Sequence, residues 1–449
     1  MRQTRAVNLP ALIACALLME VAFVLVYFAR NPGQQVKLLL WSYLISGLAF
    51  AWLLWTVRNA DDRKSSRWTI AVVIAAAIVF RLTLLPLNPA ASQDVQRYLW
   101  EGLVQLHGFN PYVLPPTAPP LAPLAHEYNA VWASVNHPDV AAIYPPVAQL
   151  LFLGNAAVFG GSLLGWKLIL FAFDGLLAAA VWALLRQRSG AMIGLAGVLW
   201  CPLLLLETYE GGHLDLIGVA LIVLALATLS RGRWIPAAIA LALAINVKYL
   251  WPLLVLIVCA RQAAQQRRGI AFVFVAAAVA AVCWLPYRSG LTEAMATAKM
   301  FAESWTFNDV IFEYLRKLPG PRWLPMAVVL GVVLAAAVVL ARRARQDIWS
   351  DAWLLSGTAL LLGPVAYPWY FMWIVPGLAL RPPLWLAIWV LAVPALHVVD
   401  WHYVTTGLWD PMPWLWLIVG TVPAALLVNG WRKRFRRPDY HERESCLTE

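Results

Sequence analysis

The chain of 449 residues is 62% hydrophobic and only 13% charged, with a mean hydropathy of +0.69. Soluble domains carry about 25% charged residues, so a soluble fold of this length could not bury so much apolar surface and most of the chain must face lipid. The net charge of +11 lies in short basic clusters between apolar runs, which argues against a nucleic-acid surface and follows the positive-inside pattern. The five cysteines form no CxxC motif, so neither a disulfide framework nor a zinc site is indicated.

Apolar runs in the chain predict an all-α integral membrane protein of roughly 13–14 transmembrane helices with one large outer loop. A helix needs about 20 residues to cross the hydrocarbon core, and several runs are shorter, so we expect these to line a water-filled cavity. The predicted spans are 9–29, 38–57, 68–87, 163–185, 191–206, 213–230, 234–247, 249–260, 269–285, 323–341, 352–366, 368–380, 384–398 and 412–429.

The positions of the basic residues predict that both termini are cytoplasmic. With the N-terminus inside, 23 of the 34 lysines and arginines fall in inside loops or in the tail. Lysine and arginine accumulate on the cytoplasmic side of membrane proteins. The apolar run 144–160 would invert every later loop if it crossed, so we predict a re-entrant or partial helix opened by Pro145 and Pro146.

The predicted topology divides the chain into four parts. They are an N-terminal helix pair at 1–67, a core at 68–380 that includes an outer loop at 88–146, C-terminal helices at 381–430, and a basic cytoplasmic tail at 431–449.

The outer loop 88–146 is the one long polar interruption, and it is dense in acids, histidines and aromatic residues. A protein that only had to sit in a membrane would not need it. An amphipathic helix is predicted after Asp94 and is expected to lie along the membrane interface. Its apolar face carries Val95, Tyr98, Leu99, Gly102, Leu103 and Leu106, and its polar face carries Asp94, Arg97, Glu101 and Gln105. Asp94 falls in the first turn, where the helix dipole favours an ionised carboxylate, so Asp94 either caps this helix or takes part in chemistry.

The segment ETYEGGHLDL places Glu207, Glu210, His213 and Asp215 around a Gly-Gly break between two apolar runs. Ionisable groups at the edge of a membrane span are costly unless they are used. The last three residues can bind a divalent cation or a cationic group, although their spacing is unspecific. The alternative is a solvated helix cap.

Lys248 lies between two predicted helices that are each too short to cross alone. A lysine at such a place is expensive unless it is paired or faces water. In a wet cavity its ammonium can hold a phosphate. The alternative is that its side chain snorkels to the interface.

Aromatic residues gather in YPWYFMWIVP, residues 367–376, and in ESWTFND with Trp305, Phe307 and Asn308. Aromatic faces with a few polar atoms suit sugar rings, and they suit the headgroup depth equally well.

Several further charged residues are interpreted as structural. Glu20 and Arg81 are intramembrane charges that can pair, and Asp174 is another intramembrane acid. His397, Asp400 and His402 are placed outside, where a solvated rim accounts for them.

The order of the motifs resembles that of a known class of membrane enzyme. SQDVQRYLWEG, GFNPY, NHPD…IYPP, GGHLD, VKYLWPLL and YPWYFMWIVP follow one another as in the GT-C class of membrane glycosyltransferases. The resemblance is closest to the bacterial polyprenyl-phosphate-mannose-type transferases of glycosyltransferase family 87 and covers roughly residues 68–380. It implies the GT-C fold and a multi-pass location in the bacterial inner membrane.

The resemblance also implies roles for individual residues. Asp94 matches the catalytic base of the first large loop, and Lys248 matches a group that engages the donor phosphate. In the mechanism we expect, Arg288 or Arg316 supports Lys248 at that phosphate. No metal site is indicated with certainty, and a divalent cation at Glu210, His213 and Asp215 stays open. The residues expected to bind substrate are Arg97, Glu101, Asn110, Tyr112, His137, Tyr144, Glu207, Glu210, His213, Asp215, Tyr249, Trp305, Asn308, Trp369 and Tyr370.

The predicted function is an inverting hexosyltransferase, with mannose as the first expectation. The donor is a polyprenyl-phosphate sugar and the acceptor is a hydroxyl of a glycolipid or glycan at the outer face. The main alternative is a transporter or flippase of a lipid-linked saccharide, which shares the many spans and the broken helices. Transporters usually show internal repeats, none of which is evident here, and rarely need so long an outer loop. A noncatalytic assembly factor derived from a transferase is a further alternative.

Overall fold

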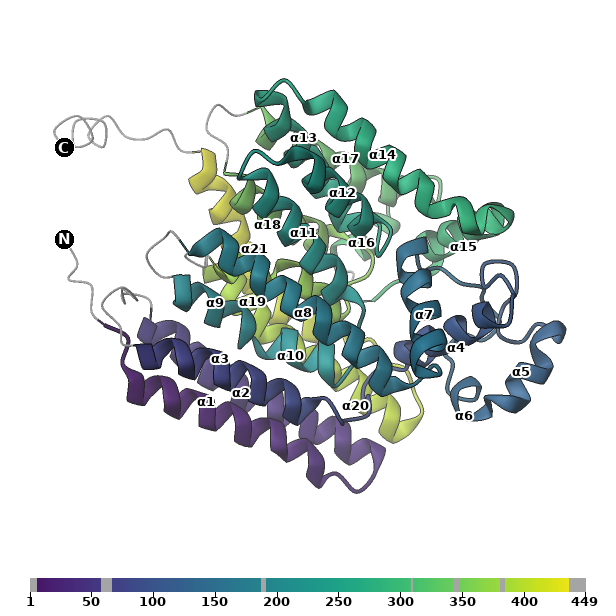
Figure 1. Cartoon of the computed structure of the whole chain (residues 1–449), viewed down its shortest axis with the longest axis horizontal. Coiled ribbons are helices and arrows are strands. Elements are labelled where there is room, and N and C mark those ends of the chain that lie inside the picture. Colours follow the sequence, from purple (N-terminus) through teal and green to yellow (C-terminus); the bar gives the residue numbers. More distant parts are fainter. Residues whose placement is uncertain are drawn as a thin grey trace.

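The computed structural model describes residues 6–57, 67–186, 191–307, 310–342, 347–379 and 384–435, and these form a helical bundle (Figure 1). One isolated bridge, between Phe307 and Val365, is the only β pairing in these ranges. The prediction of an all-α integral membrane protein is therefore confirmed.

The helices follow one another in chain order as α1 (Leu9–Val24), η1 (Leu25–Phe28), α2 (Pro32–Val57), α3 (Arg67–Leu84), α4 (Asp94–Leu106), η3 (Pro119–Leu121), α5 (Ala122–Glu127), α6 (Asn129–Trp132), α7 (Pro146–Phe159), α8 (Leu163–Leu185), α9 (Ala191–Leu199), α10 (Pro202–Tyr209), α11 (Asp215–Leu229), α12 (Trp234–Ile245), α13 (Leu250–Gln265), α14 (Gly269–Trp284), η4 (Leu285–Gly290), α15 (Leu291–Ser304), α16 (Val310–Arg316), α17 (Leu324–Ala341), α18 (Ile348–Leu362), η5 (Pro368–Ala379), α19 (Leu384–Ala392), η6 (Val393–Leu396), α20 (His397–Thr406) and α21 (Pro413–Phe435).

Fewer of these helices can cross a membrane alone than the predicted 13–14. Within the described residues, eight helices are long and apolar enough, and α9 with α10, bent by 42°, would make a ninth. Five further apolar helices have only 10–17 residues. Proline and glycine account for two of the breaks, because Pro202 separates α9 from α10 and a Gly-Gly break separates α10 from α11. The predicted span 368–380 is a buried 3₁₀ helix, η5.

The basic loops that the sequence assigned to one side do lie together. Arg231, after α11, donates to the carbonyl of Ala183 at the end of α8. Arg268, after α13, lies over Trp234 at the start of α12, and Arg261 donates to the carbonyl of Ala341 at the end of α17. The start of α1 and the end of α21 lie at one end of the bundle in Figure 1, and α4, α5, α6 and α20 lie at the other.

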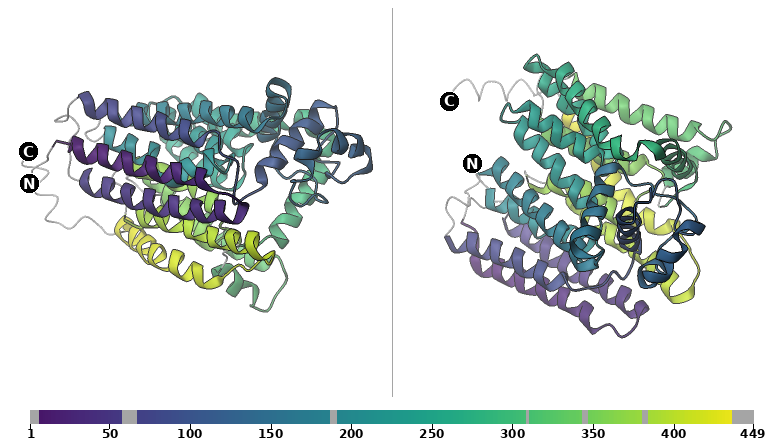
Figure 2. Two further views of the ribbon diagram at one scale, coloured as in Figure 1. Left: turned by 90° about the horizontal axis from the view of Figure 1, so that it is seen from below. Right: turned by 45° about the vertical axis from the view of Figure 1, so that its right-hand side comes forward.

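The outer loop forms a small helical layer beyond the ends of the membrane helices (Figure 1 and the left view of Figure 2). Its own apolar cluster consists of Trp100, Val104, Leu121, Leu124 and Val135, so it has a core separate from that of the bundle. The run 144–160 contains α7, which has 14 residues and begins directly after Pro145. It is too short to cross alone, as predicted for a partial helix.

Helix α4 is amphipathic, but much of its polar face is buried in the protein. Its apolar face packs on α7, where Tyr98 stacks on Phe152 with centroids 4.9 Å apart. On its polar face Arg97 and Glu101 are only 5% and 2% exposed. Protein rather than water therefore covers much of this polar face, because residues 136–149 lie over it and supply its hydrogen-bond partners.

Gly102 lets α4 and α7 approach closely. A Cβ at this position would lie 2.3 Å from the backbone oxygen of Phe152. We expect Gly102→Ala to lower the free energy of unfolding by about 1–3 kcal/mol, because the two helices must separate to admit a methyl group.

Urea unfolding in detergent, followed by tryptophan fluorescence, would measure this loss. The matched control is Gly154→Ala on α7, where an added Cβ meets nothing within 4 Å. There the greater helix propensity of alanine should leave the stability unchanged or slightly higher. Equal stability of the two variants would show that the α4–α7 contact is not tight.

The buried Arg81 pairs with Asp174 on α8 rather than with Glu20. Its Nε and Nη2 atoms donate to the two carboxylate oxygens of Asp174, and the hydroxyl of Tyr209 donates to the same carboxylate at 2.7 Å. Glu20 accepts instead from the hydroxyl of Thr83. The expected Glu20–Arg81 pair is therefore wrong. Asp174 has the structural role that was predicted for it, because its bidentate ion pair with Arg81 joins α3 to α8.

Candidate active site

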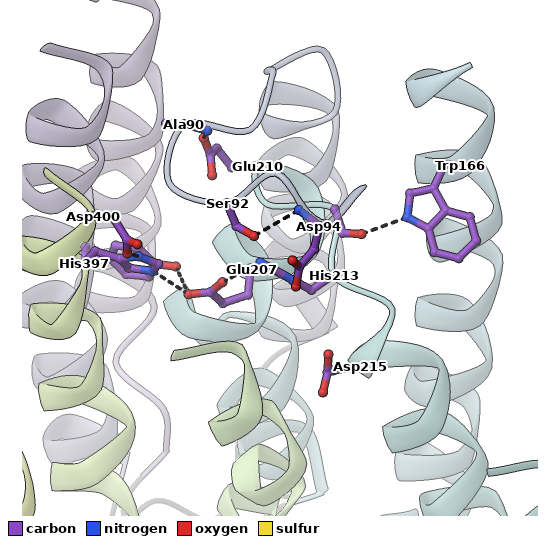
Figure 3. A network of polar contacts seen from close by, with 12 residues as sticks. Ala90, Ser92, Asp94, Trp166, Glu207, Glu210, His213, Asp215, His397 and Asp400 are labelled. Atoms are coloured by element: carbon purple, nitrogen blue, oxygen red, sulfur yellow. Dashed lines mark hydrogen bonds and ion pairs between the residues drawn. The ribbon is translucent and has the colours of Figure 1, made fainter. Parts of the chain in front are cut away.

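The backbone that leads into Asp94 is fixed by two buried charged side chains. Lys167 on α8 donates to the carbonyl of Leu87, and Glu210 accepts from the amide of Ala90 at 2.6 Å. Figure 3 shows Glu210 beside Ala90, and Ser92 accepting a hydrogen bond from the amide of Asp94. Glu210 was predicted to bind substrate, but here it holds the segment that positions Asp94.

Asp94 begins α4 and is only partly buried. The side-chain amide of Asn136 donates to its Oδ1 at 2.7 Å, and no described residue donates to its Oδ2. Burial raises the pKa of Asp94 above its ordinary value, while the hydrogen bond from Asn136 and the positive charge of Lys248 act in the opposite direction. Asp94 is thus a carboxylate with one oxygen fixed and the other free to receive a proton.

Arg97 and Glu101 fix the loop segment that carries Asn136. Arg97 contacts Glu101 at 2.9 Å and donates to the carbonyls of Asn136 and His137, each at 3.1 Å, and to that of Val140. Burial raises the pKa of the Glu101 carboxyl, and the neighbouring Arg97 opposes this. Both residues were expected to bind substrate, but their polar atoms are used within the protein.

His137 lies beside the site in a strained conformation. Its φ of +47° is in the left-handed region, which a histidine rarely adopts. Its ring packs edge-on against Trp305 at the end of α15, with centroids 4.7 Å apart. Burial and the nearby Arg97 lower the pKa of His137, so the ring is neutral near pH 7. The outer loop and α15 thus meet at two of the predicted residues.

Lys248 lies in the break between α12 and α13 and is paired with Asp215. Its Nζ is 2.7 Å from Asp215 Oδ1 and 3.8 Å from the centre of the Tyr370 ring. The indole of Trp373 also donates to Asp215 Oδ1. The side chain of Lys248 is 16% exposed, so the ammonium is neither snorkelling to a distant interface nor fully enclosed. Asp215, Lys248 and Tyr370, all predicted site residues, come together here.

The Gly-Gly break predicted around GGHLD is present and brings three chain segments together. Helix α10 ends at Tyr209 and α11 begins at Asp215. Gly212 has a φ of +73°, and its carbonyl accepts from the indole of Trp166 at 2.8 Å. His213 then stacks on Trp369 of η5, with centroids 4.1 Å apart and planes at 10°.

Two residues that the sequence reading assigned to a solvated rim are buried in this region. His397 and Asp400 on α20 are 2% and 9% exposed, and His397 lies 2.8 Å from both Glu207 and Asp400 (Figure 3). The rim interpretation is therefore wrong for these two. Their spacing of three residues could have indicated a shared helix face, but nothing in the sequence linked that face to Glu207.

Three other predicted residues make contacts within the outer loop or with η4. Tyr112 is buried and donates to the carbonyl of Tyr144, while Asn110 donates to Ser289 of η4. The Tyr112 contact lies within the outer loop, and the Asn110 contact joins that loop to η4.

The two supporting arginines do not join Lys248 in the described contacts. Arg288 is exposed on η4, and Arg316 is exposed on α16 and paired with Glu313. Tyr249, next to Lys248, is partly buried, and Asn308 lies outside the described residues.

The suggested cation ligands Glu210, His213 and Asp215 do not converge. Glu210 accepts from Ala90, His213 faces Glu207, and Asp215 is paired with Lys248. Among the described residues, no group of three or more His, Cys, Asp or Glu side chains could hold a metal ion. The proximity of Lys248 means that the cation nearest to Asp215 is an ammonium.

A half-buried carboxylate with a free oxygen, an ammonium and aromatic faces meet at the end of the helical bundle that carries the loop 88–146. Such a site can take up a proton, hold an anion and pack against a sugar ring, as a membrane glycosyltransferase must.

The family model described as "Alpha-(1->6)-mannopyranosyltransferase, N-terminal domain" matches residues 10–265, more than half of the chain. The chain therefore belongs to this family of GT-C type mannosyltransferases, and the resemblance read from the motifs is confirmed.

A curated relative supports the same assignment. Alpha-(1->6)-mannopyranosyltransferase A of Mycobacterium tuberculosis is 26% identical over 407 residues, which cover 81% of this chain and 75% of the relative. The matched family region contains Asp94, His213, Asp215 and Lys248, whereas η5 and α20 lie beyond it.

Proposed function

We propose that this protein transfers mannose from a polyprenyl-phosphate donor to a glycan or glycolipid hydroxyl at the outer face of the bacterial inner membrane, forming an α-(1→6) linkage. The linkage is taken from the name of the relative and of the family. The observation that carries the mechanism is the position of Asp94, whose Oδ1 is held by Asn136 and whose Oδ2 receives no hydrogen bond from the described residues.

Asp94 acts as the general base in this proposal. The acceptor hydroxyl attacks the anomeric carbon, its proton passes to Asp94 Oδ2, and the bond from the anomeric carbon to the phosphate oxygen breaks. Asn136 prevents rotation of the carboxylate, so the acceptor meets the same oxygen in each cycle. This single displacement inverts the anomeric centre.

Lys248 stabilises the leaving phosphate. A polyprenyl phosphate departs with its negative charge and needs positive charge near it rather than an acid. The ammonium of Lys248 is held by Asp215 and lies over Tyr370, so its position is set before the donor arrives. A fixed charge of this kind requires no reorganisation during the reaction.

The test is transfer by the purified protein in detergent. Radiolabelled polyprenyl-phosphate mannose and a nucleotide-linked mannose would each be offered with a membrane lipid and glycan extract. We expect transfer from the lipid-linked donor only, with the product anomeric centre opposite to that of the donor. Transfer from the nucleotide sugar alone would overturn the donor assignment, and retention would overturn the single displacement.

The transporter alternative makes a different prediction. A flippase would move a labelled lipid-linked saccharide across the membrane of a proteoliposome without adding the sugar to an acceptor. We expect no such movement beyond that in protein-free vesicles. Movement without transfer would replace the enzyme proposal with the flippase.

The pH dependence of transfer follows from the state of Asp94. A base must be ionised, so transfer falls as the pH drops through the pKa of Asp94. Burial raises that pKa, so the acidic limb should lie at higher pH than for an ordinary aspartate. The measurement is kcat/KM against pH with the lipid-linked donor. A profile flat down to the ordinary pKa of aspartate would contradict this role.

A further inference from the structure

The mechanism above leaves one buried group of titratable side chains unused. It joins α2, α10 and α20 next to the GGHLD loop, and we call it the Glu207 cluster: Tyr43, Glu207, His397 and Asp400 (Figure 3 shows the last three). Glu207 Oε1 accepts from the hydroxyl of Tyr43 at 2.8 Å and lies 2.8 Å from His397 Nε2. His397 Nδ1 lies 2.8 Å from Asp400 Oδ2.

The geometry of the cluster fixes its protonation. Each ring nitrogen of His397 faces a carboxylate oxygen, and a carboxylate that is ionised can only accept. Both nitrogens therefore carry protons, and His397 is an imidazolium between Glu207 and Asp400. The positive charge in turn faces the Glu207 carboxylate at 2.8 Å, so the two groups form an ion pair.

The second oxygen of Glu207 determines the state of His213. Glu207 Oε2 lies 3.5 Å from His213 Nε2, and the amide of His213 donates to the carbonyl of Glu207 at 3.0 Å. The proton of the neutral imidazole belongs on Nε2, where it faces negative charge. Nδ1 is then a lone-pair acceptor.

Nδ1 of His213 has no partner among the described residues, although the residue is only 1% exposed. A buried acceptor left unpaired costs free energy until a donor reaches it. The ring cannot turn to another partner easily, because it stacks on Trp369 with planes at 10°. Two residues further along the chain, Asp215 holds the ammonium of Lys248.

We propose that Nδ1 of His213 accepts a hydrogen bond from one hydroxyl of the donor sugar, and that the Glu207 cluster holds His213 in the tautomer that can do so. The inference rests on the proposed function. An unprotonated nitrogen cannot donate to a phosphate oxygen, so it selects a partner group that carries a proton, such as a hydroxyl. Trp369 supplies a flat apolar face beside it. His213 is thus a specificity-determining residue, and Glu207 and His397 are positioning residues.

The test pairs a protein variant with donor variants. His213→Phe keeps a ring that can stack on Trp369 and removes Nδ1. The kcat/KM of wild type and His213→Phe would be measured with polyprenyl-phosphate mannose and with a series of donors that each lack one ring hydroxyl. We expect wild type to lose about 10- to 100-fold on one member of the series, the fold-change that corresponds to one buried hydrogen bond.

His213→Phe should lose the same factor on the complete donor and nothing more on that one deoxy donor. Glu207→Gln, which keeps the shape of the cluster but not its charge, should weaken the discrimination as well. The control is His126→Phe, because His126 is exposed on α5. If His213→Phe does not fold, Glu207→Gln carries the same comparison.

Three outcomes separate the inference from the proposed function. Loss of discrimination at a single hydroxyl supports both. Equal factors for wild type and His213→Phe across the whole series would overturn the role of His213 and leave the transferase intact. Absence of transfer from every polyprenyl-phosphate sugar by wild type would overturn the proposed function, and this inference with it.

Discussion

Asp94→Asn is expected to lower the rate of mannose transfer by about 10²- to 10⁴-fold, the usual contribution of a general base. An asparagine retains the oxygen that accepts from Asn136, so the geometry at the start of α4 should persist. Its amide cannot take a proton from the acceptor. The measurement is kcat with the lipid-linked donor, together with donor binding, which should change little.

The matched control is Asp139→Asn. Asp139 is an exposed carboxylate of the same outer loop and accepts from the hydroxyl of Thr117 at 2.9 Å. Its loss should leave transfer unchanged. Wild-type rates with Asp94→Asn would move the base elsewhere. Asp215 would then be the first candidate, because Glu101 is occupied by Arg97 and Gln149.

Lys248→Met is expected to lower kcat by about 10²- to 10³-fold, comparable to the removal of one preorganised group that stabilises developing charge. Methionine keeps much of the side-chain length but not the charge. The same change leaves Asp215, which is fully buried, without its cation. Breaking a buried pair in this way costs about 3–5 kcal/mol of stability.

A second substitution separates these two effects. Adding Asp215→Asn to Lys248→Met removes the unpaired carboxylate, so the midpoint of urea unfolding should rise again while transfer stays low. The control is Lys299→Met on α15, whose side chain is 75% exposed. Recovery of transfer in the double variant would show that Lys248 acts only by neutralising Asp215.

The members of the candidate centre could be selected from the sequence because they are chemically conspicuous. Asp94, Asp215 and Lys248 are charges beside apolar runs, where a charge is expensive unless it has a use. The structure brings Lys248 and Asp215 into contact, and it places Tyr370 against them. The catalytic and substrate-binding roles of these residues stay predictions until the variants are measured.

Other residues predicted to bind substrate make contacts inside the protein. Arg97 reaches three backbone carbonyls between positions 136 and 140, and Glu210 reaches the amide of Ala90. A charged residue at a suitable position looks the same in a sequence whether it faces a ligand or the backbone. Only the fold of the outer loop shows which carbonyls and amides lie within reach.

By itself the sequence determined the all-helical membrane class, the basic end of the bundle, the break at Gly211–Gly212 and the short helix after Pro145. These four features depend on the composition and charge of short stretches of sequence and on the backbone conformations of glycine and proline. The tertiary structure decided which charges pair: Arg81 with Asp174 rather than Glu20, and His397 with Glu207 across 190 positions. Such pairs join helices that are distant in the chain and that meet only through helix packing. Local sequence patterns therefore cannot predict these pairs.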